Sequence, residues 1–309
     1  MNLIKCEKLT KKYPGSEKLA LNSVDLSIPA KGIFALIGRN GAGKTTLVRI
    51  LATQLTPTSG TASVDGFDVM REPVPIRGMI AVVPQEARTV GWISAAQQIQ
   101  TYLLWRGHGL GEANAMAKRA LSELGIARYA NEKNSSLSGG TKRKVLAAAA
   151  IASGAKMLFL DEPTTGLDPI AREELWELLF RLKRTHFIFL TTHYLEEAER
   201  LADTIGIMDE GRLLAIGSLE SLRKGMRYSH SVRFKGKIGL GKVDGRRTVG
   251  KDGFTQVFIG EKGAYELSKR LVAKGISFSI NPVSLDDIFY YYVKSGLNGS
   301  EEEGNEEEY

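Results

Sequence analysis

Five apolar runs without polar alternation recur along the first two thirds of the chain. Runs of four or five such residues predict strands buried on both faces, as in a parallel sheet covered by helices. The runs are Ile33–Ile37, Ile80–Val83, Met157–Leu160, Phe187–Leu190 and Ile205–Met208. Helical stretches lie between most of them, and this alternation is typical of an α/β fold with a mixed or parallel sheet.

Helix signals fill the spaces between these runs. One helix begins at Thr45 with an apolar stripe, and another follows Asp168 and Pro169, which suit the N-cap and the first helical position. Residues 86 to about 153 have a mostly helical pattern interrupted by glycines. We therefore expect a helical insertion subdomain there, within a first domain of residues 1–225.

The pattern changes after Gly225, where short strands and helices follow one another in mixed order. This order indicates a small C-terminal α+β domain over residues 226–298. The predicted strands are Ser231–Lys235, Phe254–Ile259 and Ile276–Ile280, and the predicted helices are Ala264–Lys274 and Leu285–Val293. Residues 299–309 contain six glutamates, and we expect them to form a disordered acidic tail.

Composition and charge narrow the class of protein. The 309 residues are 43% hydrophobic, which is enough for one large domain or two ordinary ones with packed cores. The formal net charge is +7, and without the six tail glutamates it is +13, which suits nucleic acid, an anionic membrane surface or phosphates as partners. The single cysteine, Cys6, allows no intrachain disulfide and fits a reducing compartment. We find no signal peptide and no segment able to span a bilayer, so we expect a soluble chain or one held at a membrane by a partner.

A phosphate-binding motif follows the first predicted strand. Residues 38–45 read GRNGAGKT, which fits G-x-x-x-x-G-K-[ST] between a strand and a helix. The glycines allow successive N–H groups to surround a phosphate, while Lys44 would reach the β- and γ-phosphates and Thr45 would bind Mg²⁺. An ordinary glycine turn is the alternative, and the strand before and helix after the motif disfavour it.

Polar residues follow other runs at the edge where parallel sheets bind ligands. Asp161 and Glu162 end the run at 157–160; Asp161 would hold Mg²⁺ through water, and Glu162 would position or activate the attacking water. Such a pair is usually a solvated turn, but beside a phosphate loop the functional interpretation is favoured. His193 lies past the run at 187–190, so we expect it to contact the γ-phosphate, although a lone histidine is more often structural.

The stretch LSGG, residues 137–140, precedes an apolar helix former. Ser138 could simply cap this helix. Two adjacent glycines are costly to order, however, and they suit a backbone that must approach another group closely. Because a helix N-terminus favours negative charge, we expect an anion to face Ser138, Gly139 and Gly140.

These elements, in this order, resemble the ATP-binding subunit of ABC transporters over residues 1 to about 225. Gln85, in VVPQ, resembles the Q-loop glutamine, and Gly166–Pro169 resembles the D-loop. LSGG resembles the family signature, LFLDE at 158–162 the Walker B strand, and His193 the switch histidine. Tyr13, which lies 25 residues before Gly38, occupies the place of the aromatic residue that stacks on adenine.

The resemblance implies ATP and Mg²⁺ as cofactors and ATP hydrolysis as the activity. Glu162, His193 and Gln85 are implied as catalytic, and Thr45, Gln85 and Asp161 as metal ligands. The implied nucleotide-binding residues are Tyr13, Gly38, Asn40, Gly41, Ala42, Gly43, Lys44, Thr45, Thr46, Ser138, Gly139, Gly140 and Asp168.

The resemblance also implies pairing of two ATPase domains, in which the signature of one faces the γ-phosphate held by the other. With one phosphate loop and one signature, the chain is expected to form a homodimer or a heterodimer with a related ATPase. Thr141 departs from the family, which usually has Gln after LSGG. Threonine still donates a hydrogen bond but is shorter, so we expect the closed dimer to persist with weaker contacts.

The segment SLDDIF, residues 284–289, resembles a motif of ATPases that serve ABC-2-type exporters. Its local alternative is a capping box from Ser284 to Asp287 followed by core residues. The resemblance implies an integral-membrane permease as partner and a cytoplasmic chain, peripheral on the inner face of the cell membrane. Trp92, Tyr102 and Trp105 of the helical insertion are its expected docking surface, unless they are core.

The alternative is a soluble ABC ATPase that acts on ribosomes or nucleic acid, as the basic body would allow. Such proteins usually carry paired ATPase domains or a long coiled-coil insertion, and we see neither, so no nucleic acid partner is expected. A GTPase fits poorly because residues 131–134, NEKN, do not form a guanine-reading N-K-x-D segment. The cargo is not readable from the sequence, because its contacts belong to the permease.

Overall fold

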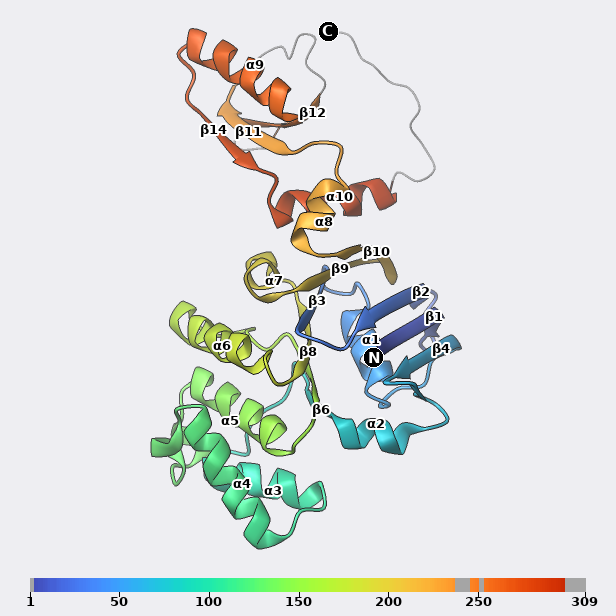
Figure 1. The fold of residues 1–309 in the computed structure, drawn as a ribbon, viewed down its shortest axis with the longest axis vertical. Helices are drawn as coiled ribbons and strands as arrows, with labels where there is room; N and C mark the ends of the chain where they lie inside the picture. The colour runs from blue at the N-terminus through green and yellow to red at the C-terminus, as the bar shows by residue number, and fades with distance from the viewer. Residues whose placement is uncertain (1–2, 237–244, 250–252, 298–309) are drawn as a thin grey trace. The chain divides into compact units, whose positions relative to one another are not determined.

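The computed structural model describes residues 3–236, 245–249 and 253–297, and the chain divides into two compact units, Met1–Leu214 and Ala215–Tyr309 (Figure 1). The predicted boundary lay after Gly225. The difference arises from α8 (Leu219–Lys224), which packs against α10 (Leu285–Leu297) of the second unit. Within that unit, Arg223 Nε donates to the Val283 carbonyl at 2.8 Å. The predicted acidic tail, 299–309, lies outside the described residues.

The first unit is built on the strands β9, β3, β8, β7 and β6 of a six-stranded sheet with the order β10-β9-β3-β8-β7-β6, and the unit boundary at Leu214 falls within β10. The strands β3, β6, β7, β8 and β9 run parallel to their neighbours in this set. Their bounds are Ile33–Ile37 (β3), Ile80–Val83 (β6), Met157–Asp161 (β7), Phe187–Thr192 (β8), Thr204–Asp209 (β9) and Arg212–Gly217 (β10). All five apolar runs are therefore strands of one sheet, and the α/β prediction is confirmed.

An antiparallel sheet with the order β2-β1-β4-β5 completes the strands of this unit and was absent from the sequence prediction. Its strands are β1 (Leu3–Lys12), β2 (Leu19–Pro29), β4 (Ser59–Val64) and β5 (Phe67–Asp68). Lys8 and Ser23 have positive φ angles of 47° and 50°, and the register of β1 shifts repeatedly along β2. These irregularities break the period-2 alternation that marks a half-buried strand.

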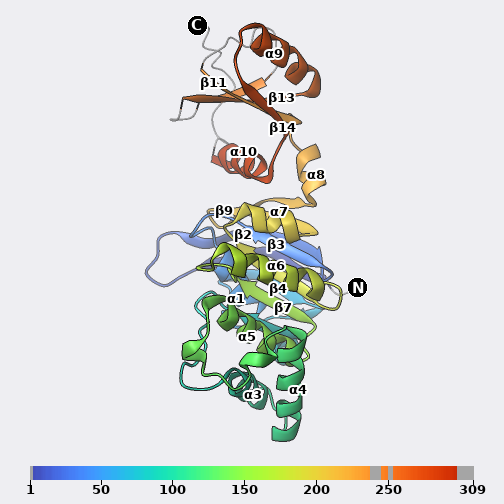
Figure 2. The same ribbon diagram turned by 90° about the vertical axis from the view of Figure 1, so that its left-hand side faces the viewer.

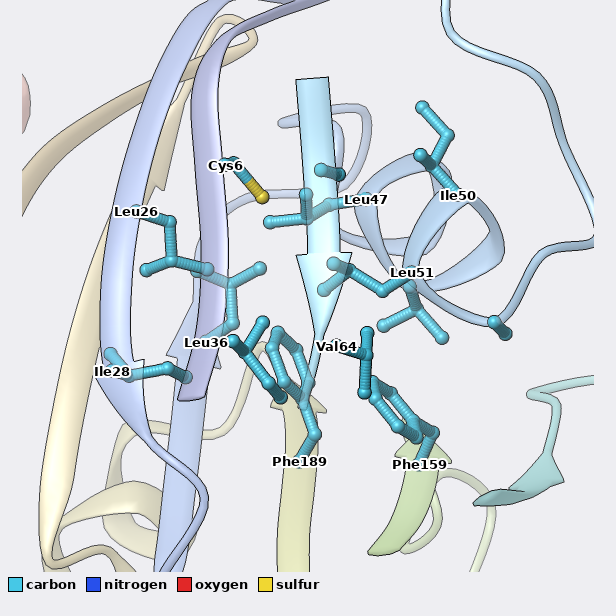
Figure 3. Close-up of a cluster of buried hydrophobic side chains, with 14 of the residues drawn as sticks. Cys6, Leu26, Ile28, Leu36, Leu47, Ile50, Leu51, Val64, Phe159 and Phe189 are labelled. Atoms are coloured by element: carbon cyan, nitrogen blue, oxygen red, sulfur yellow. The ribbon is translucent and has the colours of Figure 1, made fainter. Parts of the chain in front are cut away.

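The core of the first unit joins the two sheets (Figure 3). Leu26 and Ile28 come from β2, Leu47 from α1 (Lys44–Leu51), and Phe159 and Phe189 from the six-stranded sheet. The rings of Phe159 and Phe189 stack with their centroids 5.3 Å apart. Each fully buried side chain of this size contributes about 1.5–3 kcal/mol, so the core fixes α1 and the strand ends that carry the polar residues.

The helical insertion consists of α3 (Ala95–Trp105), α4 (Leu110–Glu123) and α5 (Gly139–Ala152), which pack on one another (Figure 2). Ser94 caps α3 in a capping box with Gln97. Two single-turn helices, Ala127–Tyr129 and Asn134–Ser136, precede α5. The prediction of helix was wrong for residues 86–93, which form an irregular segment after β6.

Three further helices complete the first unit. Helix α2 (Pro73–Met79) precedes β6, α6 (Pro169–Leu182) follows β7, and α7 (Leu195–Leu201) follows β8. Asp168 caps α6 by accepting the Ala171 N–H at 2.9 Å, as the Asp-Pro pair predicted. Among the residues that the structure describes, no helix is both long and apolar enough to cross a membrane.

The second unit is an antiparallel sheet with the order β12-β13-β11-β14 and the helices α8, α9 and α10. The bounds are Gly245–Val249 (β12), Phe254–Ile259 (β13), His230–Lys235 (β11), Phe278–Pro282 (β14) and Glu261–Ala273 (α9). Leu267 and Leu271 of α9 pack on Val232 and Phe234 of β11. The sequence did not predict β12 or α8, and it placed β14 two residues early.

The SLDDIF segment begins α10 as a capping box. The Ser284 N–H donates to Asp287 Oδ2 at 2.9 Å, and the Asp287 N–H donates to Ser284 Oγ at 3.2 Å. Gln256 Nε2 of β13 donates to Asp287 Oδ1 at 2.8 Å, while Ile288 is fully buried. The local explanation of this segment is therefore sufficient: it caps α10 and attaches that helix to the sheet.

Candidate active site

The phosphate-binding motif forms the turn between β3 and α1. Gly43 caps α1 with a left-handed φ of 103°. A Cβ at this position would collide with the Ala20 carbonyl, so glycine is required both by φ and by space. The loop thus presents the unpaired N–H groups at the start of α1, an arrangement that binds anions.

Lys44 lies within the loop and is only 4% exposed. Its ammonium group donates to the carbonyls of Gly38 at 2.8 Å and Arg39 at 3.2 Å. It also lies 3.4 Å from Glu162 Oε1. A buried ammonium requires such partners, and these hold the cation at the mouth of the loop.

A cavity of about 340 Å³ opens in front of this loop. Its lining joins the loop to residues far away in the sequence, which are Gln85 after β6 and Glu162 after β7. The lining residues are Ala20, Asn40, Gly41, Ala42, Gly43, Lys44, Thr45, Thr46, Gln85 and Glu162. Among the residues that the structure describes, Ser138, Gly139 and Asp168 are not part of this lining.

Glu162 is the centre of the polar network at this cavity. Its Oε2 atom accepts hydrogen bonds from Gln85 Nε2 at 3.1 Å and Thr165 Oγ1 at 3.2 Å. His193 Nδ1 lies 2.9 Å from the same oxygen, and because a carboxylate only accepts, this nitrogen carries the proton. Residues that are distant in sequence thus meet at one carboxylate.

The backbone of Glu162 is unusual, with a φ of +47°. Its N–H donates to the backbone oxygen of Thr191 at 3.0 Å and to the Thr191 hydroxyl at 3.1 Å. A non-glycine residue in this region costs about 1–3 kcal/mol, and such strain is found most often at functional sites. The side chain of Glu162 is therefore placed by its backbone as well as by its hydrogen bonds.

Asp161 is 2% exposed and accepts a hydrogen bond from the Thr191 hydroxyl. In the described part of the chain, no group of three or more His, Cys, Asp or Glu side chains could hold a metal ion. Mg²⁺ typically uses one or two carboxylates together with phosphates and water. A single carboxylate with the hydroxyl of Thr45 and the amide of Gln85 is therefore compatible with Mg²⁺ bound together with a nucleotide.

Tyr13 lies at the end of β1 beside the loop. Its hydroxyl is 3.2 Å from Thr46 Oγ1, and its ring is 36% exposed. Lys11 Nζ lies 5.5 Å from the ring centroid. An exposed aromatic ring at this place is available for stacking, as the resemblance implied, and that role stays a prediction.

The signature segment starts α5, with Ser138 as its N-cap. The Ser138 hydroxyl accepts the Thr141 N–H at 3.2 Å and lies 2.9 Å from the Thr141 hydroxyl. Gly140 is buried, and a Cβ there would lie 2.7 Å from the Cβ of Ala171 on α6. Helix packing therefore explains Gly140, whereas Gly139 is exposed and stays a candidate for close approach to an anion.

Several residues of the site were missing from the sequence prediction. Thr165 and Ala20 gave no local signal, because each acquires its place only through the fold. Thr191 follows an apolar run at the edge where ligands were expected, but the sequence indicated no role for it beside Asp161 and Glu162. Arg143 reaches the Gln85 carbonyl from α5, and no spacing rule indicates that contact.

A glycine-bounded anion loop with a buried lysine, next to a strand that ends in Asp-Glu, defines a P-loop nucleoside triphosphatase site. The family description "ABC transporter" matches residues 21–165. The daunorubicin resistance ATP-binding protein DrrA3 of Streptomyces coeruleorubidus is 38% identical, over 72% of this chain and 72% of its own length. This chain therefore belongs to the ABC transporter family, and its first unit is an ATP-binding ATPase domain.

Two other relatives have similar sequence identities to this chain, but the chain covers very different shares of their lengths. The daunorubicin/doxorubicin resistance ATP-binding protein DrrA of Streptomyces peucetius is 36% identical, with 71% of this chain and 66% of that protein matched. Human ATP-binding cassette sub-family A member 2 is 35% identical over 70% of this chain, which spans only 9% of that protein. The chain thus corresponds to a small part of this longer relative.

Solved structures share the fold of the first unit. The ATP-binding subunit of an ABC transporter superposes with a TM-score of 0.62 at 27% identity, covering 72% of this chain and 92% of that one. A dimeric ATP-binding cassette, MJ0796, bound to ADP and Pi, gives a TM-score of 0.62 at 24% identity, covering 70% and 98%. The α/β P-loop fold is confirmed by both.

Proposed function

We propose that this chain hydrolyses ATP to power a separate membrane permease of an ABC-2-type exporter. The observation that carries the proposal is the Glu162 carboxylate, which lies between Lys44, Gln85 and His193 at the phosphate loop. The family and the names of the antibiotic-resistance relatives support the direction of transport. In this proposal the chain is peripheral on the inner face of the cell membrane, held there by the permease.

The proposed chemistry divides between the loop and the strand ends. The loop N–H groups and Lys44 hold the phosphates, with Tyr13 against the adenine. Thr45, Gln85 and Asp161 would hold Mg²⁺, which neutralises charge on the β- and γ-phosphate oxygens when it is bound. Glu162 accepts a proton from a water molecule while the oxygen of that water attacks the γ-phosphorus. The bond between the γ-phosphorus and ADP breaks, and phosphate leaves. His193 orients the Glu162 carboxylate.

The cavity in front of the loop is open, and its described lining lacks the signature residues. We propose that a second ATPase chain, identical or related, supplies Ser138 and Gly139 to the γ-phosphate. Gly166 and Leu167 line a pocket together with Gly139 of the signature, and Asp168 follows them as the cap of α6. Asp168 would therefore lie at the same interface. The Thr141 hydroxyl, beside Ser138, would take the place of the longer glutamine of the family.

We propose that the permease docks on the helical insertion. Trp92 and Trp105 are 79% and 84% exposed, so these two are not core, whereas Tyr102 is half-buried. Trp105 and Tyr102 line a groove of about 670 Å³ together with Arg77 and Arg106. An exposed tryptophan beside a groove, as Trp105 is, is a typical anchor point of a protein interface.

The experiment is a pull-down from detergent-solubilised native membranes with the tagged chain and with its Trp105→Ser variant. We expect a multi-span membrane protein to copurify with the wild type and to be reduced at least about tenfold by the substitution, which removes one central aromatic anchor. Phe180→Ser, on α6, is the matched control and should change nothing. Recovery of ribosomes or nucleic acid without a membrane protein would overturn the transport proposal.

A further inference from the structure

The irregular segment that carries Gln85 is hydrogen bonded to the segment that carries the signature. Asn134 Nδ2 donates to the Val90 carbonyl at 3.0 Å, and the Asn134 N–H donates to the Ile93 carbonyl at 2.9 Å. The Ser135 N–H donates to the Gly91 carbonyl at 3.0 Å. The later half of the segment is thus attached to residues just before α5.

Arg143 attaches the first half. It lies on α5, and its guanidinium donates to the Gln85 carbonyl at 3.1 Å and to the Ala87 carbonyl at 3.4 Å. These carbonyls belong to a turn closed by the Ala87 N–H and the Pro84 carbonyl at 2.9 Å. Arg143 is half-buried, and burial lowers the pKa of its guanidinium, yet arginine keeps its charge in proteins. Its hydrogen bonds are therefore charge-assisted.

These contacts join two parts of the proposed mechanism. Ser138 begins α5, and Arg143 lies five residues later on the same helix, about 7.5 Å along its axis. Gln85, whose carbonyl Arg143 holds, donates from its side chain to Glu162 at 3.1 Å. Through these contacts, a displacement of the start of α5 would move the backbone of Gln85 and, through its side chain, the hydrogen bond to Glu162.

We propose that Arg143 is a positioning residue that makes the placement of Gln85 follow the position of the signature helix. This inference rests on the proposed function, since it requires Ser138 to dock on the nucleotide of a second chain. Arg143 touches no substrate. It acts through Gln85, so that the hydrolytic site is completed when the signature is engaged.

The chain provides a matched control on the next residue of α5. Lys144 pairs with Glu174 of α6 at 2.8 Å, so it also joins α5 to a neighbouring element, but not to the Gln85 segment. Lys144→Gln and Arg143→Gln each remove one cation from the same helix together with its contact to a neighbouring element, a single ion pair for Lys144 and two hydrogen bonds for Arg143. A difference between them reports the contact with Gln85 rather than the charge or stability of α5.

The experiment is a double-mutant cycle in the full chain. Steady-state ATPase activity is measured for Arg143→Gln and Lys144→Gln in the wild-type chain and in the Gln85→Ala variant. The Glu162→Gln variant provides the blank rate, which is subtracted from each measurement. We expect Arg143→Gln to lower kcat about tenfold, with KM for ATP within about twofold, because charge-assisted hydrogen bonds to the site are lost. In the Gln85→Ala background the same substitution should lower kcat less than about twofold, because interacting residues are not additive.

Lys144→Gln should stay within about twofold of its parent in both backgrounds. Melting temperatures identify unfolded variants. If Arg143→Gln does not fold, the same cycle is carried out with Arg143→Lys, which keeps the cation but not the paired donors of the guanidinium. An equal loss from the Arg143 substitution in both backgrounds, with an active wild type, would overturn this proposal alone. A wild type without ATPase activity and without ATP-dependent dimerisation would overturn the proposed function itself.

Discussion

Gly139 and Gly140 are adjacent in the chain but meet different surroundings. A Cβ on Gly139 would find only Leu167 Cδ2 at 3.9 Å, which is ordinary contact. A Cβ on Gly140 would lie 2.7 Å from that of Ala171, so α5 and α6 would have to separate. Of the two glycines, the second is therefore needed by the fold itself.

Gly140→Ala should lower the free energy of unfolding by about 1–3 kcal/mol, because it overpacks the contact between α5 and α6. Gly139→Ala is the matched control; it should leave stability unchanged or raise it by up to about 1 kcal/mol, since alanine favours helix. Urea titrations of both variants and the wild type provide the measurement. Equal effects of the two substitutions would contradict the packing explanation.

Most single residues of the site could be predicted because their signals are local. Lys44 and Thr45 follow from an eight-residue spacing, and Glu162 follows from its place after an apolar strand. Of the residues that donate to Glu162, Gln85 was expected at the site through the resemblance, whereas Thr165 was not. Neither hydrogen bond could be predicted, because both depend on the fold. Its positive φ could not be predicted at all, since it depends on the pairing of β7 with β8.

At the scale of helices and strands, continuous apolar runs were a reliable signal and interrupted alternation was not. The parallel strands are buried on both faces, so their sequences need no periodicity. Strands β1 and β2 are half-buried and irregular, and β12 has the sequence GRRTV, whose apolar content is low. These strands are held by pairing with a neighbouring strand, β2 with β1 and β12 with β13, and the pattern within one segment does not contain that pairing.

Helices α6 and α7 are joined by a buried carboxylate. Glu197 of α7 is fully buried, and its Oε1 accepts the Trp176 Nε1–H of α6 at 3.0 Å. Burial raises the pKa of Glu197 from its ordinary value of 4.5. The folded protein therefore binds this proton more tightly than the unfolded chain does.

This pKa shift predicts a pH dependence of stability. The contribution of Glu197 is greatest below pH 4.5 and is lost as the pH rises through the raised value, because the buried group must then ionise. Glu197→Gln, which resembles the neutral acid, should therefore gain stability relative to the wild type between pH 5 and pH 8. Urea midpoints at both pH values measure this, with the exposed Glu177→Gln as control. A difference between Glu197→Gln and wild type that does not change with pH would refute it.

At the scale of the whole molecule, each unit has its own core. The first unit contains the phosphate loop, Glu162 and the signature, while the second is organised around β11 and α9. All the residues that line the cavity thus belong to the first unit. The signature segment of the same chain does not line it, which is why association with a second ATPase is part of the proposed function.

Glu162→Gln should lower ATP hydrolysis at least about 100-fold, because it removes the proposed base while leaving the loop and Lys44 intact. With ATP and Mg²⁺ the variant should therefore accumulate as a dimer, which size-exclusion chromatography with light scattering detects. Lys44→Ala in the same background removes a phosphate contact and should return the protein to the monomer. A variant that binds ATP but stays monomeric would count against the sandwich of two chains.

The order of the central sheet has a consequence for synthesis. Strand β3 ends at Ile37, yet its two neighbours, β8 and β9, begin only at Phe187 and Thr204. At about 5–20 residues per second, a ribosome needs roughly 8–30 s to add the intervening residues. Throughout that interval the strand that precedes the phosphate loop has no partner and exposes an apolar edge. The central strand of the sheet can therefore be paired on both sides only after β8 and β9 have emerged from the ribosome.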